Sequence, residues 1–85
     1  MFGIEHWGVE PDIMVMAKGA ANGAPVGITI ATPEVAEALR GSHISTFGGN
    51  PVTATAVLAT LEAIEKRRLV ENAEKMGNHL RYRLN

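Results

Sequence analysis

The segment that decides the fold is Ile13-Met14-Val15-Met16-Ala17, which runs into Lys18 and then into Gly19-Ala20-Ala21-Asn22-Gly23. A short run that is apolar at every position is typical of a strand buried on both faces of a sheet. The small residues that follow predict a loop with almost no side-chain bulk. Lys18 is therefore expected where a buried strand ends and an open loop begins.

Lys18 allows two interpretations. A lysine beside a core strand is uncommon unless it is paired or reaches solvent, and burial favours the neutral amine, which is the form that attacks carbonyl groups. The simpler interpretation is a solvated lysine that ends a strand, because perturbed, reactive groups are a minority of charged residues. Position alone favours this simpler interpretation.

Further along the chain, residues 26–31 form a second apolar run, which predicts a second buried strand. Thr32-Pro33-Glu34 then combines an N-cap hydroxyl, a proline at the first helical position and an acid in the first turn. The helix that begins here is expected to stop at Gly41. Before the first strand, Pro11-Asp12 indicates a turn, and Asp12 is expected to be a turn or strand-entry residue.

Asn50-Pro51 repeats the signal of a cap followed by a proline and predicts the strongest helix of the chain. Its apolar residues recur at helical spacing, and further apolar residues lie off this stripe, so we expect a core helix covered around much of its circumference. The stripe consists of Ala54, Val57, Leu58, Leu61 and Ile64, and the further residues are Val52, Ala56, Ala59 and Ala63. An amphipathic helix should follow, and the sequence leaves open whether Arg67-Arg68 separates the two.

Two strands and two or three helices do not complete a sheet that is covered on both faces. The sequence therefore predicts an α/β fold of which this chain is a piece. The alternative is a small homo-oligomer whose strands pair across copies of the chain.

The composition excludes several classes of function. The 85 residues include no cysteine, 46% are hydrophobic and the formal net charge is −1, as in ordinary globular proteins. We expect no nucleic-acid partner, no membrane span and no metal site, since His6, His43 and His79 are far apart in sequence. The expected location is the cytoplasm, or the mitochondrion if the source is eukaryotic.

Residues 41–49 are rich in glycine and hydroxyl groups and precede a helix N-terminus. Such a loop can bind a phosphate through backbone N–H groups and the helix dipole. It can equally be a simple turn, with Ser45 and Thr46 as caps and Gly48-Gly49 in unusual backbone conformations. It is not a Walker-type loop, because no Gly-Lys-Ser/Thr follows the glycines.

Residues 8–19, then Asn22-Gly23 and then Ser45-Thr46-Phe47-Gly48-Gly49-Asn50-Pro51 resemble the class III aminotransferases, which depend on pyridoxal 5'-phosphate. The ornithine, acetylornithine, 4-aminobutyrate and alanine-glyoxylate enzymes belong to that family. The resemblance covers essentially the whole chain. It implies a fragment of the large domain of a fold type I transferase, a mixed sheet covered by helices, that leads into the small domain. Residues 1–66 would belong to the large domain, and residues 67–85 would form the connecting helix and the start of the small domain.

The resemblance also implies roles for two residues. Lys18 matches the Schiff-base lysine, which binds the aldehyde of pyridoxal phosphate and moves a proton at the substrate α carbon. Thr46 matches a threonine that binds the cofactor phosphate of the opposite subunit in a homodimer. The implied reaction transfers an amino group from an amino donor to a 2-oxo acid or an aldehyde, with a slight leaning toward the alanine-glyoxylate and acetylornithine branches.

Several parts of the family's active site have no match in these residues. The acid that contacts the pyridine nitrogen would precede Met1, and Asp12 does not replace it. The aromatic residue that stacks on the ring and the arginine that binds a substrate carboxylate are also absent. Two alternatives therefore stay open: a noncatalytic fragment or small oligomerising interaction module, and a loop that binds a nucleotide phosphate without amine chemistry.

Overall fold

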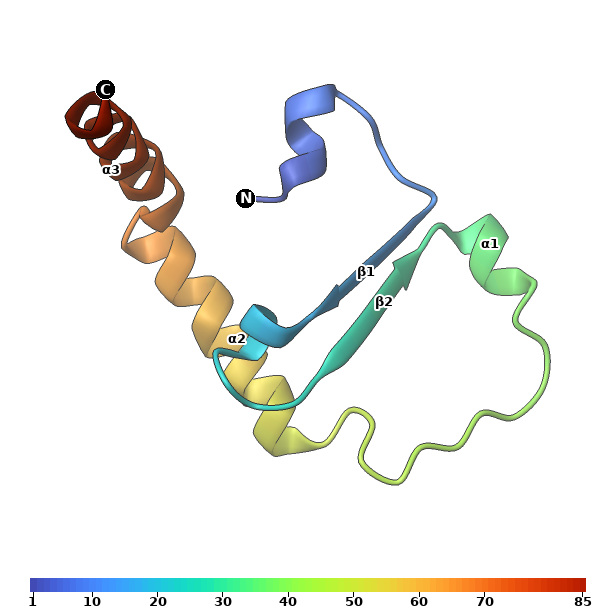
Figure 1. Cartoon of the computed structure of the whole chain (residues 1–85). Helices are drawn as coiled ribbons and strands as arrows, with labels where there is room; N and C mark the ends of the chain where they lie inside the picture. Colours follow the sequence, from blue (N-terminus) through green and yellow to red (C-terminus); the bar gives the residue numbers. More distant parts are fainter.

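The computed structural model describes all 85 residues (Figure 1). Three α-helices, two strands and two short 3-10 helices follow one another along the chain. Their order is η1 (Gly3–Trp7), β1 (Ile13–Ala17), η2 (Lys18–Ala21), β2 (Gly27–Ala31), α1 (Pro33–Glu37), α2 (Pro51–Lys66) and α3 (Leu69–Leu84).

The two predicted strands pair with each other. They run antiparallel, with Ile13 opposite Ala31 and Ala17 opposite Gly27. The backbone carbonyl of Asp12 accepts a hydrogen bond from Thr32 N–H at 3.0 Å, which closes the far end of the ladder and agrees with Asp12 as a strand-entry residue. Within one chain, β1 and β2 are therefore each other's partners, and pairing across copies stays a prediction.

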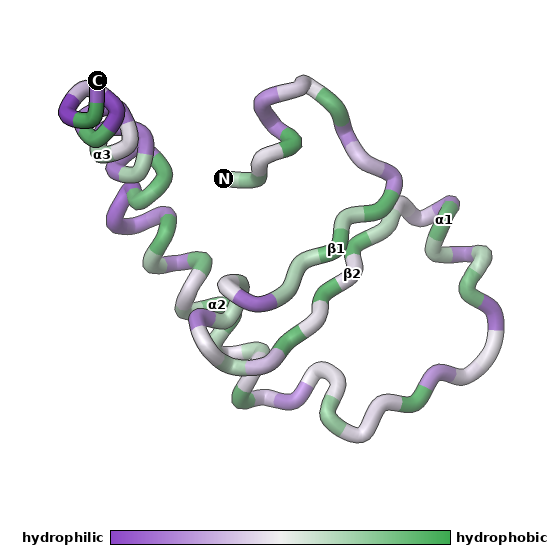
Figure 2. Tube along the Cα trace, viewed as in Figure 1, coloured by the Kyte–Doolittle hydropathy of each residue, from purple (hydrophilic) through white to green (hydrophobic).

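The expectation that both faces of these strands are covered is wrong for this chain. Residues of β1 alternate between exposed and half-buried, and neither strand holds a buried residue. The strands are nevertheless among the more hydrophobic parts of the trace (Figure 2). The apolar run was correctly predicted as strand, but these 85 residues do not supply the layers that would cover it.

Helix α1 begins where the sequence predicted and ends earlier. The Thr32 hydroxyl accepts a hydrogen bond from Val35 N–H at 3.5 Å, and Pro33 occupies the first turn. The last regular residue is Glu37 rather than a residue next to Gly41. Leu39, the last apolar residue before the expected end at Gly41, is 70% exposed. A helix this short needs packing to persist, so it ends when that contact is missing.

Helix α2 begins at Pro51, as predicted, and Asn50 caps it. Asn50 Oδ1 accepts from Thr53 N–H at 3.0 Å, and Asn50 Nδ2 donates to the carbonyl of Phe47 at 2.8 Å. The protected face differs from the predicted stripe, because Leu58 is 58% exposed and Ala54 is also exposed. The half-buried residues are Thr53, Ala56, Val57, Thr60, Leu61, Ala63 and Ile64. In this chain α2 is therefore covered on one face only, not around its circumference.

The question left open at Arg67-Arg68 is resolved as a break between two helices. Arg68 has φ +50° and ψ +49°, in the left-handed region. This conformation costs an ordinary residue about 1–2 kcal/mol. The axis changes direction here, and α3 extends away from the sheet (Figure 1).

The start of α3 is supported by Glu71, which should make the helix sensitive to acid. Its own backbone N–H and then the Arg68 guanidinium, whose Nε lies 3.1 Å from Glu71 Oε1, hold the pKa of Glu71 below its usual value. A lowered pKa stabilises the folded state above the unfolded value, and this contribution disappears as the pH falls through the lowered pKa. We expect helix content, measured by circular dichroism on the full chain, to decrease from pH 5 to pH 3. A Glu71→Gln variant should show a smaller decrease, and equal decreases would contradict the assignment.

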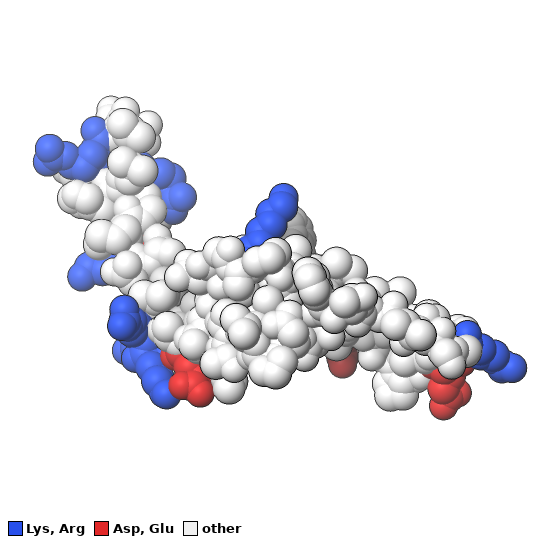
Figure 3. All heavy atoms as spheres, turned by 90° about the horizontal axis from the view of Figure 1, so that it is seen from below, with Lys and Arg blue, Asp and Glu red and all other residues white.

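The molecule is extended and exposes most of its apolar surface. Its radius of gyration is 16.6 Å, whereas a compact domain of this length has about 12 Å. Only Ala21 is buried. Figure 3 shows one face whose middle is almost free of charged side chains, with charge concentrated toward both ends. No helix has the length and apolar character needed to cross a bilayer.

Candidate functional site

Lys18 lies at a sharp change in backbone direction. The residue before it, Ala17, is extended, with φ −158° and ψ −170°, and is held by its pairing with Gly27 in the sheet. Lys18 itself has φ +53°, in the left-handed region. Lysine has no short polar side chain that could offset this conformation by a local hydrogen bond, so the strain is of order 1–2 kcal/mol. The chain thus leaves the sheet through a strained residue that carries an amine.

The turn after Lys18 is short and closed by backbone hydrogen bonds. Asn22 N–H donates to the carbonyl of Gly19 at 3.1 Å, and Ala24 N–H donates to that of Ala21 at 3.3 Å. Asn22 also has a left-handed backbone, with φ +48°. Two left-handed residues therefore flank a single helical turn of small residues.

This turn packs on helix α2. Contacts between η2 and α2 are the most extensive tertiary contacts of the chain after strand pairing, and Ala21 within the turn is only 4% exposed. In Figure 1 the turn lies directly beside α2. The small residues after Lys18, which predicted an open loop, instead allow the turn to approach the helix closely.

The amine of Lys18 is free. Lys18 is exposed and forms no ion pair or hydrogen bond, whereas Lys66 Nζ contacts Glu62 Oε2 at 2.6 Å. These 85 residues therefore do not provide the burial that the reactive-amine interpretation of Lys18 requires, and within this chain the amine is solvated. The reason is the missing cover over the sheet, since the strand that precedes Lys18 is itself exposed.

The loop before α2 contains a tight turn. Ser45 Oγ accepts from Gly48 N–H at 3.0 Å, so Ser45 does cap a turn. A Cβ atom on Gly48 would lie 2.7 Å from that oxygen, and Gly49 has φ +67°. Thr46 is exposed and its hydroxyl forms no hydrogen bond within the chain. Gly48 leaves room for the Ser45 hydroxyl, and only Gly49 has the left-handed backbone expected of both glycines. The Thr46 hydroxyl remains available to a ligand.

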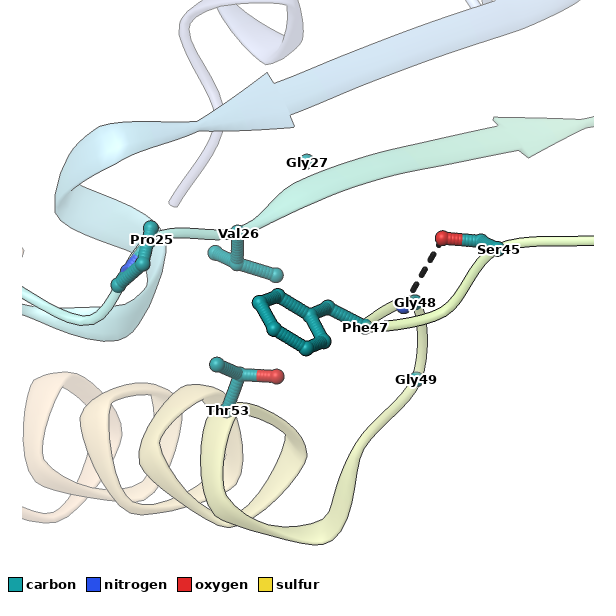
Figure 4. Close-up of a pocket in the computed structure, with 8 residues that line it drawn as sticks. All are labelled: Pro25, Val26, Gly27, Ser45, Phe47, Gly48, Gly49 and Thr53. Atoms are coloured by element: carbon teal, nitrogen blue, oxygen red, sulfur yellow. Dashed lines mark hydrogen bonds between the residues drawn. The ribbon is translucent and has the colours of Figure 1, made fainter.

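An open cavity of about 500 Å³ lies between this loop and the start of β2 (Figure 4). The ring of Phe47 points toward Val26 and Thr53, and the Ser45 turn forms one side. The lining residues are Pro25, Val26, Gly27, Ser45, Phe47, Gly48, Gly49 and Thr53. Their grouping was not predicted, because nothing in the sequence indicates that the start of β2 meets this loop.

The two predicted site residues do not share a cavity. Neither Lys18 nor Thr46 lines any of the five principal cavities. Lys18 belongs to the turn at the end of β1, and Thr46 belongs to the long loop before α2. None of these five cavities is therefore built from both residues.

The whole chain matches the model of one protein family. The family model described as aminotransferase class-III matches residues 1–85. The chain belongs to the class III aminotransferases. This confirms the resemblance drawn from the motifs around Lys18 and Thr46.

Similar members of this family are several times longer. The chain is 49% identical over 84 residues to acetylornithine aminotransferase of Archaeoglobus fulgidus, covering 98% of this chain and 22% of that enzyme. It is 50% identical over 84 residues to the mitochondrial alanine-glyoxylate aminotransferase 2 homolog 2 of Arabidopsis thaliana, covering 98% of this chain and 18% of that protein. The class III chain thus spans about a fifth of the length of these curated relatives.

A solved structure shows the same arrangement. The S-selective transaminase from Arthrobacter sp., determined with alanine bound, matches with a TM-score of 0.86 and 38% identity. The match covers 98% of this class III chain and 19% of that chain. The likeness confirms the expected α/β fold class, in which the helices and the small antiparallel sheet form one part of a larger transaminase architecture.

Proposed function

We propose that these residues form part of a transaminase dependent on pyridoxal 5'-phosphate, in which Lys18 is the Schiff-base lysine. The observation that carries the proposal is the geometry at Lys18. A strained, left-handed backbone places an unpaired amine at the end of a strand, and strain of this kind is concentrated at functional sites. Membership in the class III family supports the same conclusion.

The residues present suit the cofactor. A primary amine free of ion pairs at Lys18 can bond to an aldehyde, and an unpartnered hydroxyl at Thr46 can donate to a phosphate. Pyridoxal phosphate supplies an aldehyde for the amine and a ring that takes up electrons released at the substrate α carbon. Lys18 Nζ would hold the cofactor at rest and move the proton at that carbon during turnover.

The proposed assembly is a homodimer in which Thr46 serves the neighbouring site. Support comes from the separation of the two residues into different parts of the chain, neither of which places its residue in a principal cavity. The substrates would be an amino donor and a 2-oxo acid or an aldehyde. We further propose that residues 1–66 belong to the cofactor-binding domain and residues 67–85 begin the small domain, since the helix breaks at Arg67-Arg68.

A hybrid enzyme provides the test of this function. In it, the 84 residues of the Archaeoglobus fulgidus enzyme that match are replaced by this chain, so that the rest of that enzyme supplies the missing cover. The hybrid is incubated with pyridoxal phosphate, treated with borohydride and digested, and the label is located by mass spectrometry. We expect the label on Lys18 at close to one per chain.

Lys66 and Lys75 are the internal controls for nonspecific reaction, because both belong to helices and not to the turn that begins at Lys18. Label spread evenly over the three lysines would contradict the proposal. That result would favour the second reading of the chain, a noncatalytic interaction module, for which the exposed apolar strands are the supporting observation.

A further inference from the structure

We propose that Ala21 is a positioning residue for Lys18. This inference rests on the proposed function, because it concerns how the lysine is aimed rather than which residue reacts. The Ala21 methyl group, held where η2 packs on α2, would keep the backbone at Lys18 in its left-handed conformation.

The left-handed backbone at Lys18 is strained. A lysine returns to an ordinary backbone conformation unless the structure on both sides prevents it. On the N-terminal side, Ala17 is fixed by its pairing with Gly27. On the C-terminal side the turn is four residues long, and hydrogen bonds within it do not tie it to the rest of the molecule.

The tie to the rest of the molecule is the contact with α2. Ala21 is the one buried residue of the chain, and it lies in the turn that begins at Lys18. Helix α2 is in turn fixed at its start by the Asn50 cap and presents a half-buried face. A change of one or two methyl groups at Ala21 therefore alters the distance between the turn and α2, and the backbone at Lys18 must follow.

The direction of the lysine matters for the chemistry. A side chain that both holds a cofactor and moves a proton must reach two positions, and a misplacement of about 1 Å can cost about a hundredfold in rate. The sequence shows only a small residue at position 21. The structure shows that this residue is buried and lies in the turn that packs on α2.

The test compares Ala21→Val, which overfills the contact, with Ala21→Gly, which removes it, in the hybrid enzyme. Both should lower kcat on the order of tenfold to a hundredfold with little change in KM. Both should also weaken the visible circular dichroism of the bound cofactor, which reports how the ring is held, while the label still forms on Lys18. Ala21→Gly keeps the test valid if Ala21→Val does not fold.

Matched controls are Ala59→Val and Ala59→Gly, because Ala59 lies on the exposed side of α2. They carry the same chemical changes inside an α-helix, at a cost in helix stability of about 1 kcal/mol or less. They should leave kcat and the dichroism within about twofold. Unchanged kcat and dichroism in both Ala21 variants would overturn the inference. Equal effects at Ala59 would also overturn it, because a general loss of stability would then explain the result. Absence of label on Lys18 in the unsubstituted hybrid would instead refute the proposed function.

Discussion

Replacing Lys18 by alanine in the hybrid enzyme is expected to lower kcat at least about a thousandfold. The side chain is proposed to act twice, as the amine that bonds to the cofactor aldehyde and as the carrier of the proton at the substrate α carbon. Losing both roles in one substitution removes more than an ordinary acid-base contribution. The measurement is kcat at saturating substrate and cofactor, with bound cofactor quantified so that a binding defect is not mistaken for a chemical one.

Two further variants separate the chemistry of Lys18 from its charge. Lys18→Arg keeps a positive charge but has a guanidinium that remains protonated, so it should be as inactive as alanine. Lys66→Ala removes an exposed amine that bonds only to Glu62, and it should keep full activity within about twofold. If Lys18→Arg retained more than about a tenth of the activity, Lys18 would be acting as a charge rather than as a nucleophile.

The local signals in the sequence predicted helix starts well. Thr32 and Asn50 cap α1 and α2 as expected, because a cap depends on residues only three positions apart. The strand 13–17 was also found, because its composition is independent of its partners. The predictions that depended on burial were wrong. The length of α1 and the protected face of α2 depend on which other surfaces pack against these helices, and the local sequence does not contain that information.

The candidate site was predicted in its residues but not in its geometry. The motifs indicated Lys18 and Thr46, whereas the left-handed backbone at Lys18 could not be predicted because lysine does not favour it. Glycine adopts a left-handed backbone without strain, so the sequence alone favours Gly19, one position later, for this conformation. The left-handed Asn22 was more accessible, since Asn-Gly pairs are typical of turns.

Replacing Thr46 by alanine is expected to weaken cofactor binding in the hybrid enzyme by about tenfold to a hundredfold. A hydrogen bond to a charged phosphate contributes about 1.5–3 kcal/mol. The Thr46 hydroxyl forms no hydrogen bond within the chain, so its removal should affect only the bond to the phosphate. The dissociation constant of pyridoxal phosphate, measured by absorbance titration, is the readout. Thr46→Ser keeps the hydroxyl and should bind nearly as well as the unsubstituted protein.

Mixed dimers then reveal which site Thr46 serves. If each site takes Lys18 from one subunit and Thr46 from the other, a dimer of one Lys18→Ala chain and one Thr46→Ala chain has one complete site and one doubly defective site. Refolding the two variants together in equal amounts makes half of the dimers mixed, so about a quarter of the unsubstituted activity should return at limiting cofactor. If Thr46 served its own subunit, both sites of the mixed dimer would be defective, and the mixture would be no more active than the average of its parents. Recovery of activity therefore requires that the loop before α2 crosses the subunit boundary.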